Sequence, residues 1–117
     1  MKSITIRKNG GFYSVYGDDA YILFYLFGYR IIDDKVGFPI NSYNKVINCL
    51  EENYINYNVM INDLNVNFKK RNRYNKFLEL GKRKFSISYR INCILEKLNT
   101  LDEESIDQII KFIEEKL

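Results

Sequence analysis

The sequence holds few of the side chains that carry out enzymatic chemistry. It has no histidine and only two cysteines, Cys49 and Cys93, which lie far apart along the chain. Without histidine there is no Ser–His or Cys–His nucleophile pair and no imidazole ligand for a metal. Two isolated thiols do not make a zinc or iron–sulfur site. We therefore expect no metal, no cofactor and no enzymatic activity, and we expect both cysteines to be reduced core residues.

One pair of adjacent carboxylates could be taken for catalytic residues. Asp18 and Asp19 follow Gly17 and precede an apolar run that begins at Ala20. Aspartate at a helix start accepts hydrogen bonds from free backbone N–H groups and favours the positive end of the helix dipole. No base or metal ligand stands close to the pair in the sequence, so we interpret both residues as helix-capping side chains.

Charge is concentrated in one stretch of the chain. The net charge of +3 averages residues 1–68 at −1, residues 69–90 at +8 and residues 91–117 at −4. A dense basic stretch interleaved with aromatic residues is typical of phosphate contacts combined with base stacking. The candidate phosphate-binding residues are Lys69, Lys70, Arg71, Arg73, Lys76, Lys82, Arg83 and Lys84.

Three other interpretations of this basic stretch remain open. Its cations could form an ordinary solvated helix face, as many charge runs do. They could dock onto an acidic surface of another protein. They could also be shielded by the chain's own acidic C-terminal segment, which would weaken the nucleic-acid hypothesis.

The first half of the chain predicts a small sheet with interleaved helices. Residues 3–7 and 12–16 alternate or are rich in β-formers, and Asn9-Gly10-Gly11 between them favours a tight hairpin turn. In the second of these strands Phe12, Ser14 and Tyr16 share one face and Tyr13 and Val15 the other, so Phe12 is exposed if Tyr13 and Val15 face the core. A nearly all-apolar helix is expected over residues 20–27, and Gly28 ends it.

Further strands and a second helix complete this half. Residues 29–32 are expected to form a short strand, and residues 37–40 a connector in which Pro39 stops any helix. A second helix is expected from Asn41 or Ser42 to about Asn53, and a strand over residues 57–61. The order is strand, strand, helix, strand, helix, strand.

The second half predicts helices. A short helix over residues 74–80 is expected to end at Gly81. An apolar stripe and a last helix over residues 103–117 then form a helical hairpin that turns at residues 99–102, where Thr100 and Glu103 have capping-box spacing. The stripe consists of Ile87, Ile91, Ile94, Leu95 and Leu98.

These patterns predict an α+β (α/β) fold in which a small mixed β-sheet is flanked by helices and followed by a C-terminal helical hairpin. Residues 1–62 form the core, and residues 63–117 form a basic segment and helical extension packed on the same domain. A chain of 117 residues suits a single domain. Neither a signal-peptide apolar region nor a membrane-spanning run is evident, so we expect a cytoplasmic protein with no membrane contact.

Two motifs in the first half resemble the mismatch-recognition domain (domain I) of the MutS family. The stretch from Gly11 to Ala20 reads Gly-Phe-Tyr-Ser-Val-Tyr-Gly-Asp-Asp-Ala and resembles the family's Phe-Tyr-Glu motif with its helix-opening Asp-Asp-Ala. Residues 37–43, Gly-Phe-Pro-Ile-Asn-Ser-Tyr, resemble the family's Gly-Ile-Pro connector. The resemblance covers about residues 4–61 and implies a mixed sheet flanked by helices. The other MutS domains, including the ATPase, are absent from this sequence.

The resemblance also implies roles for two residues. Phe12 stands where the family has a phenylalanine that wedges beside a mispaired base, an insertion that replaces lost stacking at a kinked step. Ser14 stands where the family has a glutamate that hydrogen-bonds the base. A serine cannot supply that carboxylate, so the resemblance implies DNA contact without the family's mismatch discrimination. For Phe12, packing as an ordinary core aromatic is the alternative.

The leading hypothesis is a non-enzymatic nucleic-acid-binding protein, with duplex DNA as the expected partner. The alternative is a protein-binding regulator or inhibitor encoded by a phage or mobile element, for example of the anti-CRISPR kind, which uses the same fold for protein contacts. A homodimer through the C-terminal helices is a further expectation.

Overall fold

A computed structural model describes residues 2–61, 64–68 and 72–117. The chain divides into two compact units, Met1–Phe85 and Ser86–Leu117, called unit 1 and unit 2 below. The division lies inside a long helix, because the first turns of that helix belong to the core of unit 1.

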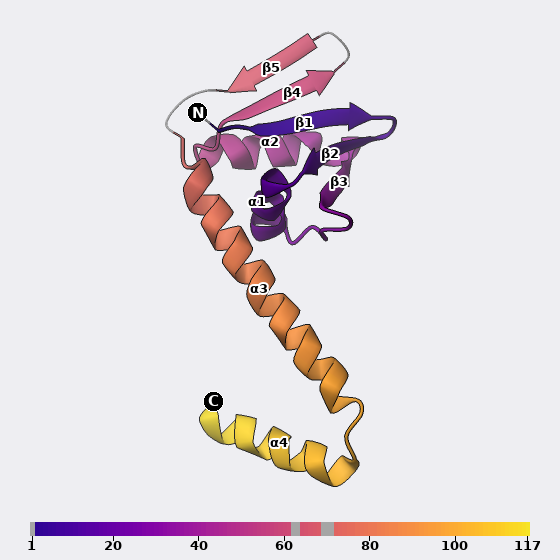
Figure 1. Ribbon diagram of the computed structural model, residues 1–117. Coiled ribbons are helices and arrows are strands. Elements are labelled where there is room, and N and C mark those ends of the chain that lie inside the picture. Colours follow the sequence, from indigo (N-terminus) through magenta and orange to yellow (C-terminus); the bar gives the residue numbers. More distant parts are fainter. Residues whose placement is uncertain (1, 62–63, 69–71) are drawn as a thin grey trace. The chain divides into compact units, whose positions relative to one another are not determined.

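Unit 1 is built on a five-stranded mixed sheet with the order β3-β2-β1-β4-β5 (Figure 1). Neighbouring strands are antiparallel except for β1 and β4, which run parallel. The strands are β1 (Ile4–Asn9), β2 (Phe12–Tyr16), β3 (Lys35–Pro39), β4 (Tyr57–Ile61) and β5 (Leu64–Phe68). The α+β class predicted from the sequence is confirmed.

Four α-helices and one 3-10 turn accompany these strands in the described part of the chain. They are α1 (Asp18–Phe27), η1 (Ile40–Ser42), α2 (Tyr43–Glu52), α3 (Tyr74–Leu98) and α4 (Glu103–Lys116). Gly28 ends α1 in the left-handed conformation, with φ 73°, as the sequence predicted.

A single apolar core lies between one face of the sheet and the helices of unit 1. Alternate strand residues point into it, including Ile4 and Ile6 of β1 and Val15 of β2, all fully buried. They meet apolar side chains from α1, α2 and the first two turns of α3. All core residues that come from helices belong to this one cluster. The helices of the core therefore cover one face of the sheet and leave the opposite face free of them.

Two strand predictions were wrong. Residues 29–32 form no strand beyond an isolated bridge between Ile32 and Lys35, and the strand is instead β3, which includes the expected connector. Asp33 and Asp34 adopt left-handed φ angles of 51° and 62°, so the chain turns there and pairs only afterwards. The structure also has β5, which the sequence reasoning assigned to a basic, asparagine-rich segment without a strand.

The short helix that was expected to stop at Gly81 is also wrong, since α3 continues through that glycine to Leu98. Gly81 is buried, and a Cβ atom added there would lie 2.3 Å from the backbone oxygen of Tyr21. The glycine therefore allows α3 to approach the backbone of α1, and it does not act as a helix cap.

Unit 2 consists of the second half of α3, a turn and α4. Asp102 caps α4, because its Oδ1 accepts a hydrogen bond from the Ser105 N–H at 2.8 Å. The expected capping box from Thr100 is wrong, since the Thr100 hydroxyl donates instead to the Lys97 carbonyl oxygen. The apolar residues of both helices remain largely exposed, with Ile91 at 52% and Ile113 at 45%.

Candidate nucleic-acid interface

The strand register places a set of aromatic, cationic and amide side chains on the helix-free face of the sheet. Residues paired directly across neighbouring strands point to the same face. On this face Phe12, Ser14 and Tyr16 of β2 are paired with Pro39, Gly37 and Lys35 of β3. On the other side Ser14 pairs with Arg7 of β1, whose next neighbour is Met60 of β4. We call this surface the open sheet face.

Two aromatic side chains stand exposed on the open sheet face. Phe12 is 56% exposed and Tyr16 is 47% exposed, while Tyr13 and Val15 between them are buried in the core. The structure thus shows Phe12 on the exposed face of the strand, and its alternative interpretation as an ordinary core aromatic residue is wrong. Phe12 and Tyr16 are four residues apart, which corresponds to about 13 Å along a strand.

Ser14, the second residue singled out from the resemblance, lies between the two aromatic residues. It is 3% exposed. It is paired with Gly37 on β3, and neither Ser14 nor Gly37 places a bulky side chain between the two rings. Ser14 therefore forms part of the floor of this face, with little of its own surface available to a partner.

Cations and amides flank the aromatic residues, and none of the strand residues that the structure describes on this face is a carboxylate. Arg7 is exposed on β1 and Lys35 is half-buried on β3. Asn58 on β4 and its β5 partner Asn67 extend the same face toward the other edge of the sheet. The Oδ1 atom of Asn58 is buried and has no hydrogen-bond partner among the described residues.

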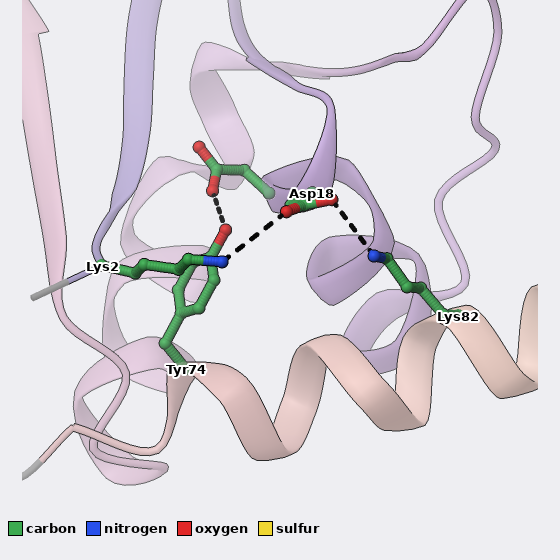
Figure 2. A network of polar contacts seen from close by, with 5 residues as sticks. Lys2, Asp18, Tyr74 and Lys82 are labelled. Atoms are coloured by element: carbon green, nitrogen blue, oxygen red, sulfur yellow. Dashed lines mark hydrogen bonds and ion pairs between the residues drawn. The ribbon is translucent and has the colours of Figure 1, made fainter.

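The carboxylates of Asp18 and Asp19 join elements rather than cap α1 with hydrogen bonds, so the predicted N-cap was wrong, although both acids lie in the first turn as predicted. Asp19 accepts a hydrogen bond from the Tyr74 hydroxyl at 2.5 Å and another from the Thr5 N–H at 3.0 Å. The N-cap position is occupied by Gly17, and no side chain caps the helix. In Figure 2 the Tyr74 hydroxyl points at the carboxylate oxygen to which it donates.

Asp18 forms two ion pairs at the protein surface. The ammonium groups of Lys2 and Lys82 approach its carboxylate from different sides, at 4.0 Å and 3.5 Å (Figure 2). Together with the Asp19 contacts, these pairs connect the N-terminal segment, α1 and α3 of unit 1.

Burial dominates the electrostatics of Asp19 and Tyr74. Desolvation raises the pKa of Asp19 above 3.8, although the hydrogen bonds from Tyr74 and Thr5 act in the opposite direction. Desolvation and the bond to Asp19 raise the pKa of Tyr74. Tyr74 therefore keeps its hydroxyl proton and acts as a donor to the carboxylate.

The described part of the basic stretch lies on α3 and on the residues that precede it. Lys69, Lys70 and Arg71 lie outside the described residues. Lys82 pairs with Asp18, and Arg83 pairs with Glu79 at 3.4 Å.

The remaining described cations of unit 1's basic stretch lie over aromatic rings. Arg73 and Lys76 are 5.8 Å and 5.9 Å from the centroid of the Phe77 ring. Lys84 lies 5.2 Å from the centroid of the Phe24 ring. Each described cation in the predicted set thus has a partner within the chain, although the side chains of Lys82 and Arg83 are more than half exposed.

The structure does not bring Phe12 together with the beginning of α3. The Asn72 side chain, two residues before α3, donates to the Lys2 carbonyl oxygen, next to the start of β1. Phe12 pairs with Asn9, at the other end of β1. These two predicted contact regions are therefore separated by the length of a strand.

Sequence reasoning missed Tyr16, Arg7 and Lys35 as candidate contact residues. The signal for Tyr16 was present, because it shares the face of Phe12 in an alternating strand. The signal for Lys35 was hidden, because β3 was taken for a turn and a connector.

Comparison of the chain with protein-family models, curated proteins and solved structures gives no match. The resemblance to the MutS mismatch-recognition domain therefore stays a prediction. Within the described residues, no helix combines the length and the hydrophobicity needed to cross a bilayer.

Proposed function

We propose that unit 1 binds single-stranded or locally unpaired nucleic acid on its open sheet face. The observation that carries this proposal is the pair of exposed rings, Phe12 and Tyr16, on one strand of a face whose described strand residues include cations and no carboxylate. Two exposed rings on one face of a sheet offer an apolar surface to a partner, and every nucleic-acid base has a flat surface that stacks on such rings.

The cations give the same face a means of contacting the backbone. Arg7 stands beside Ser14 on the neighbouring strand, and Lys35 stands beside Tyr16. An arginine forms paired hydrogen bonds with a phosphate, and a lysine acts as a point charge. The exposed amide of Asn67 adds a donor and an acceptor that suit the edges of bases.

The arrangement favours an unpaired strand over the regular duplex expected from the sequence. In a regular duplex the flat surfaces of the bases are covered by their neighbours, so a ring on a sheet reaches them only at an end or at a distorted step. An unpaired strand offers base surfaces to both Phe12 and Tyr16, while its phosphates remain within reach of the flanking cations.

The proposal is tested by measuring the anisotropy of a short labelled single strand and of the matching duplex at several salt concentrations. Phe12→Ala and Tyr16→Ala are each expected to weaken single-strand binding by about 1–3 kcal/mol, the usual value of one base stacked on an aromatic ring. Arg7→Gln is expected to lower the slope of log affinity against log salt by about 0.7, as one lost phosphate contact would.

Matched controls separate the sheet from other surfaces. Tyr89 is 63% exposed in unit 2, so Tyr89→Ala removes an exposed ring elsewhere and is expected to change nothing. Lys76→Gln and Arg83→Gln remove cations on α3. If these helix variants weaken binding while the sheet variants do not, the interface is the basic face of α3 and the sheet proposal is wrong.

A protein contact is the second candidate, and it concerns unit 2. Its α3 segment exposes apolar side chains at helical spacing, and α4 exposes Ile110, Phe112 and Ile113 at 44–60%. We propose a second copy of the chain as the occupant, because residues 86–98 carry two basic groups against one acid, whereas residues 103–116 carry five acids against two lysines. The positive segment of one copy then meets the negative helix of the other.

A further inference from the structure

A cavity lies at the β3 edge of the sheet in unit 1. Its volume is about 640 Å³, and its lining includes Tyr16, Tyr29, Arg30, Asp33 and Lys35. Pockets for small ligands and cofactors commonly measure about 300–1,000 Å³, so a single nucleotide fits this space. Because Tyr16 and Lys35 also belong to the open sheet face, the cavity continues the proposed interface at its edge.

The walls of the cavity are held in place by the fold. The Tyr29 ring stacks on Phe27 and on Phe38, with centroid distances of 5.1 Å and 6.1 Å. Backbone hydrogen bonds of 2.9 Å and 3.1 Å join Ile32 to Lys35. The site therefore needs little ordering when a ligand enters, which favours binding.

One more hydrogen bond and two unusual backbone angles define the loop that carries Arg30 and Asp33. The Gly17 N–H donates to the Asp34 carbonyl oxygen at 2.9 Å, which connects the loop to the end of β2. Asp33 and Asp34 hold left-handed φ angles in this turn. A non-glycine residue in that conformation is uncommon, so the turn's shape is set by the surrounding contacts.

The charged groups of the cavity are available to a ligand. Among the residues that the structure describes, none of the recorded ion pairs involves Arg30, Asp33 or Lys35. Arg30 is exposed and Lys35 is half-buried, so both reach solvent at the cavity wall. Two cations suit a phosphate group, and one carboxylate suits the amino group of a base or a sugar hydroxyl.

We propose that this cavity binds one nucleotide by its phosphate and its base together. Arg30 and Lys35 hold the phosphate, the tyrosine rings cover the base, and Asp33 accepts a hydrogen bond from a base amino group or a sugar hydroxyl. This inference rests on the proposed function, because the nucleotide is the 5′-phosphorylated end of a strand that lies on the open sheet face. A free nucleoside monophosphate presents the same chemistry.

The test uses the fluorescent base 2-aminopurine, whose emission is quenched by stacking, with the full-length chain. The riboside 5′-monophosphate is expected to bind with quenching, and the riboside without phosphate about tenfold more weakly, as the loss of a charged hydrogen bond predicts. Arg30→Gln is expected to weaken monophosphate binding by about the same factor. Arg30 is exposed, so this variant is expected to fold normally.

Several results would overturn the proposal. It is wrong if the riboside and the monophosphate bind equally, if Arg30→Gln binds like the parent chain, or if inorganic phosphate competes as well as the nucleotide does. Tyr89→Ala is the matched control, since Tyr89 is an exposed ring outside the cavity lining, and it is expected to leave monophosphate binding unchanged.

Measuring the binding of a nucleic-acid single strand shows whether the cavity proposal or the proposed function of the open sheet face is wrong. If a single strand binds through Phe12 while the monophosphate does not bind at all, the proposed function stands and the cavity proposal is overturned. If the monophosphate binds through Arg30 while the strand does not bind, the cavity stands without the sheet. A 5′-phosphate that adds nothing to strand affinity would overturn the strand-end assignment and leave free nucleotides as the ligand.

Discussion

The Asp19 carboxylate joins three parts of unit 1 through hydrogen bonds. It lies in α1, receives the backbone N–H of Thr5 from β1 and receives the hydroxyl of Tyr74 from α3. A buried charge without such donors is expensive, whereas a carboxylate with good hydrogen bonds is tolerated. The pair of bonds therefore determines whether this carboxylate stabilises or destabilises the fold.

Tyr74→Phe removes one donor and leaves the ring in place. Since hydrogen bonds to charged groups are worth about 1.5–3 kcal/mol, we expect the free energy of unfolding to fall by that amount at neutral pH. Urea denaturation followed by circular dichroism measures the change. Tyr89→Phe, at an exposed site, is the control and is expected to have no effect. Equal stabilities for the two variants would contradict the prediction.

The pH dependence of stability supplies a second residue-scale prediction. Because burial raises the pKa of Asp19 above 3.8, the folded chain holds this proton more tightly than the unfolded chain does. The contribution of Asp19 is therefore most favourable below pH 3.8 and declines as the pH rises through the raised pKa. Asp19→Asn removes this contribution, so the stability difference between parent and variant is expected to decrease from acid to neutral pH. A difference that grows with pH would show that the pKa is lowered in the fold.

At the scale of single residues, the sequence predicted which side chains share a face better than it predicted their partners. The alternation in β2 placed Phe12 and Tyr13 on opposite faces, and the structure shows Phe12 outward and Tyr13 inward. The partner of Asp19 was out of reach, because Tyr74 lies 55 positions away and only the packed fold brings them together. Capping rules assigned Asp18 and Asp19 to hydrogen bonds at the start of their own helix. In the structure their carboxylates contact residues from other parts of the chain instead.

At the scale of elements, α3 shows how a glycine can be misinterpreted. Glycine after a short apolar helix usually marks its end, and Gly81 has that position in the sequence. In the structure it is a contact point between two helices, with the backbone of Tyr21 directly opposite. Sequence alone does not distinguish these roles, because the distinction depends on a second helix that lies 60 positions earlier.

Gly81→Ala tests this contact. Alanine favours a helix by about 1 kcal/mol over glycine, so a purely local view expects stabilisation. We expect destabilisation instead, by about 1–3 kcal/mol, because a methyl group there overlaps backbone that has to shift. Thermal unfolding measures the change. Ser86→Ala, at an exposed position of the same helix, is the control and is expected to be neutral or slightly stabilising. A stabilised Gly81→Ala chain would mean that α3 and α1 are not in close contact.

The strand β5 marks a different limit of sequence interpretation. Its residues Leu64–Phe68 read Leu-Asn-Val-Asn-Phe, an alternation that is typical of a half-exposed strand. The asparagines and the nearby cations directed attention to charge, and the period-2 pattern was overlooked. For β3 the pattern itself was weak, because Gly37 and Pro39 are unusual inside strands, although Pro39 is tolerated at the edge position that β3 occupies.

At the scale of the whole molecule, charge and apolar surface are divided between the two units. Residues 1–85 carry 14 basic and eight acidic side chains, whereas residues 86–117 carry four basic and seven acidic ones. The buried core belongs to unit 1, while unit 2 has exposed apolar side chains. This division suits a basic unit that meets a polyanion and a second unit that meets protein.

The apolar surface of unit 2 includes a specific recess on α3. A cavity of about 260 Å³ is lined by Ile87, Arg90, Ile91 and Ile94. Phe112 on α4 is 60% exposed and is the right kind of side chain to enter the recess of a second copy. A two-fold dimer would use each recess and each phenylalanine once, which is the self-complementarity that such an interface needs.

Self-association is therefore the expected outcome for the full-length chain, and it is measured by sedimentation equilibrium over a range of concentrations. Ile91→Asp is expected to weaken the dimer by at least about tenfold, since burying one isoleucine contributes about 1.5–3 kcal/mol. Tyr89→Asp adds the same charge two residues away and is the matched control, because two residues along a helix turn the side chain to a different face.

A chain that stays monomeric at all concentrations would contradict the dimer. If Ile91→Asp instead lowers the melting temperature of a monomer, α4 closes over α3 within one chain, as the predicted helical hairpin requires, and the apolar surface of unit 2 is satisfied internally.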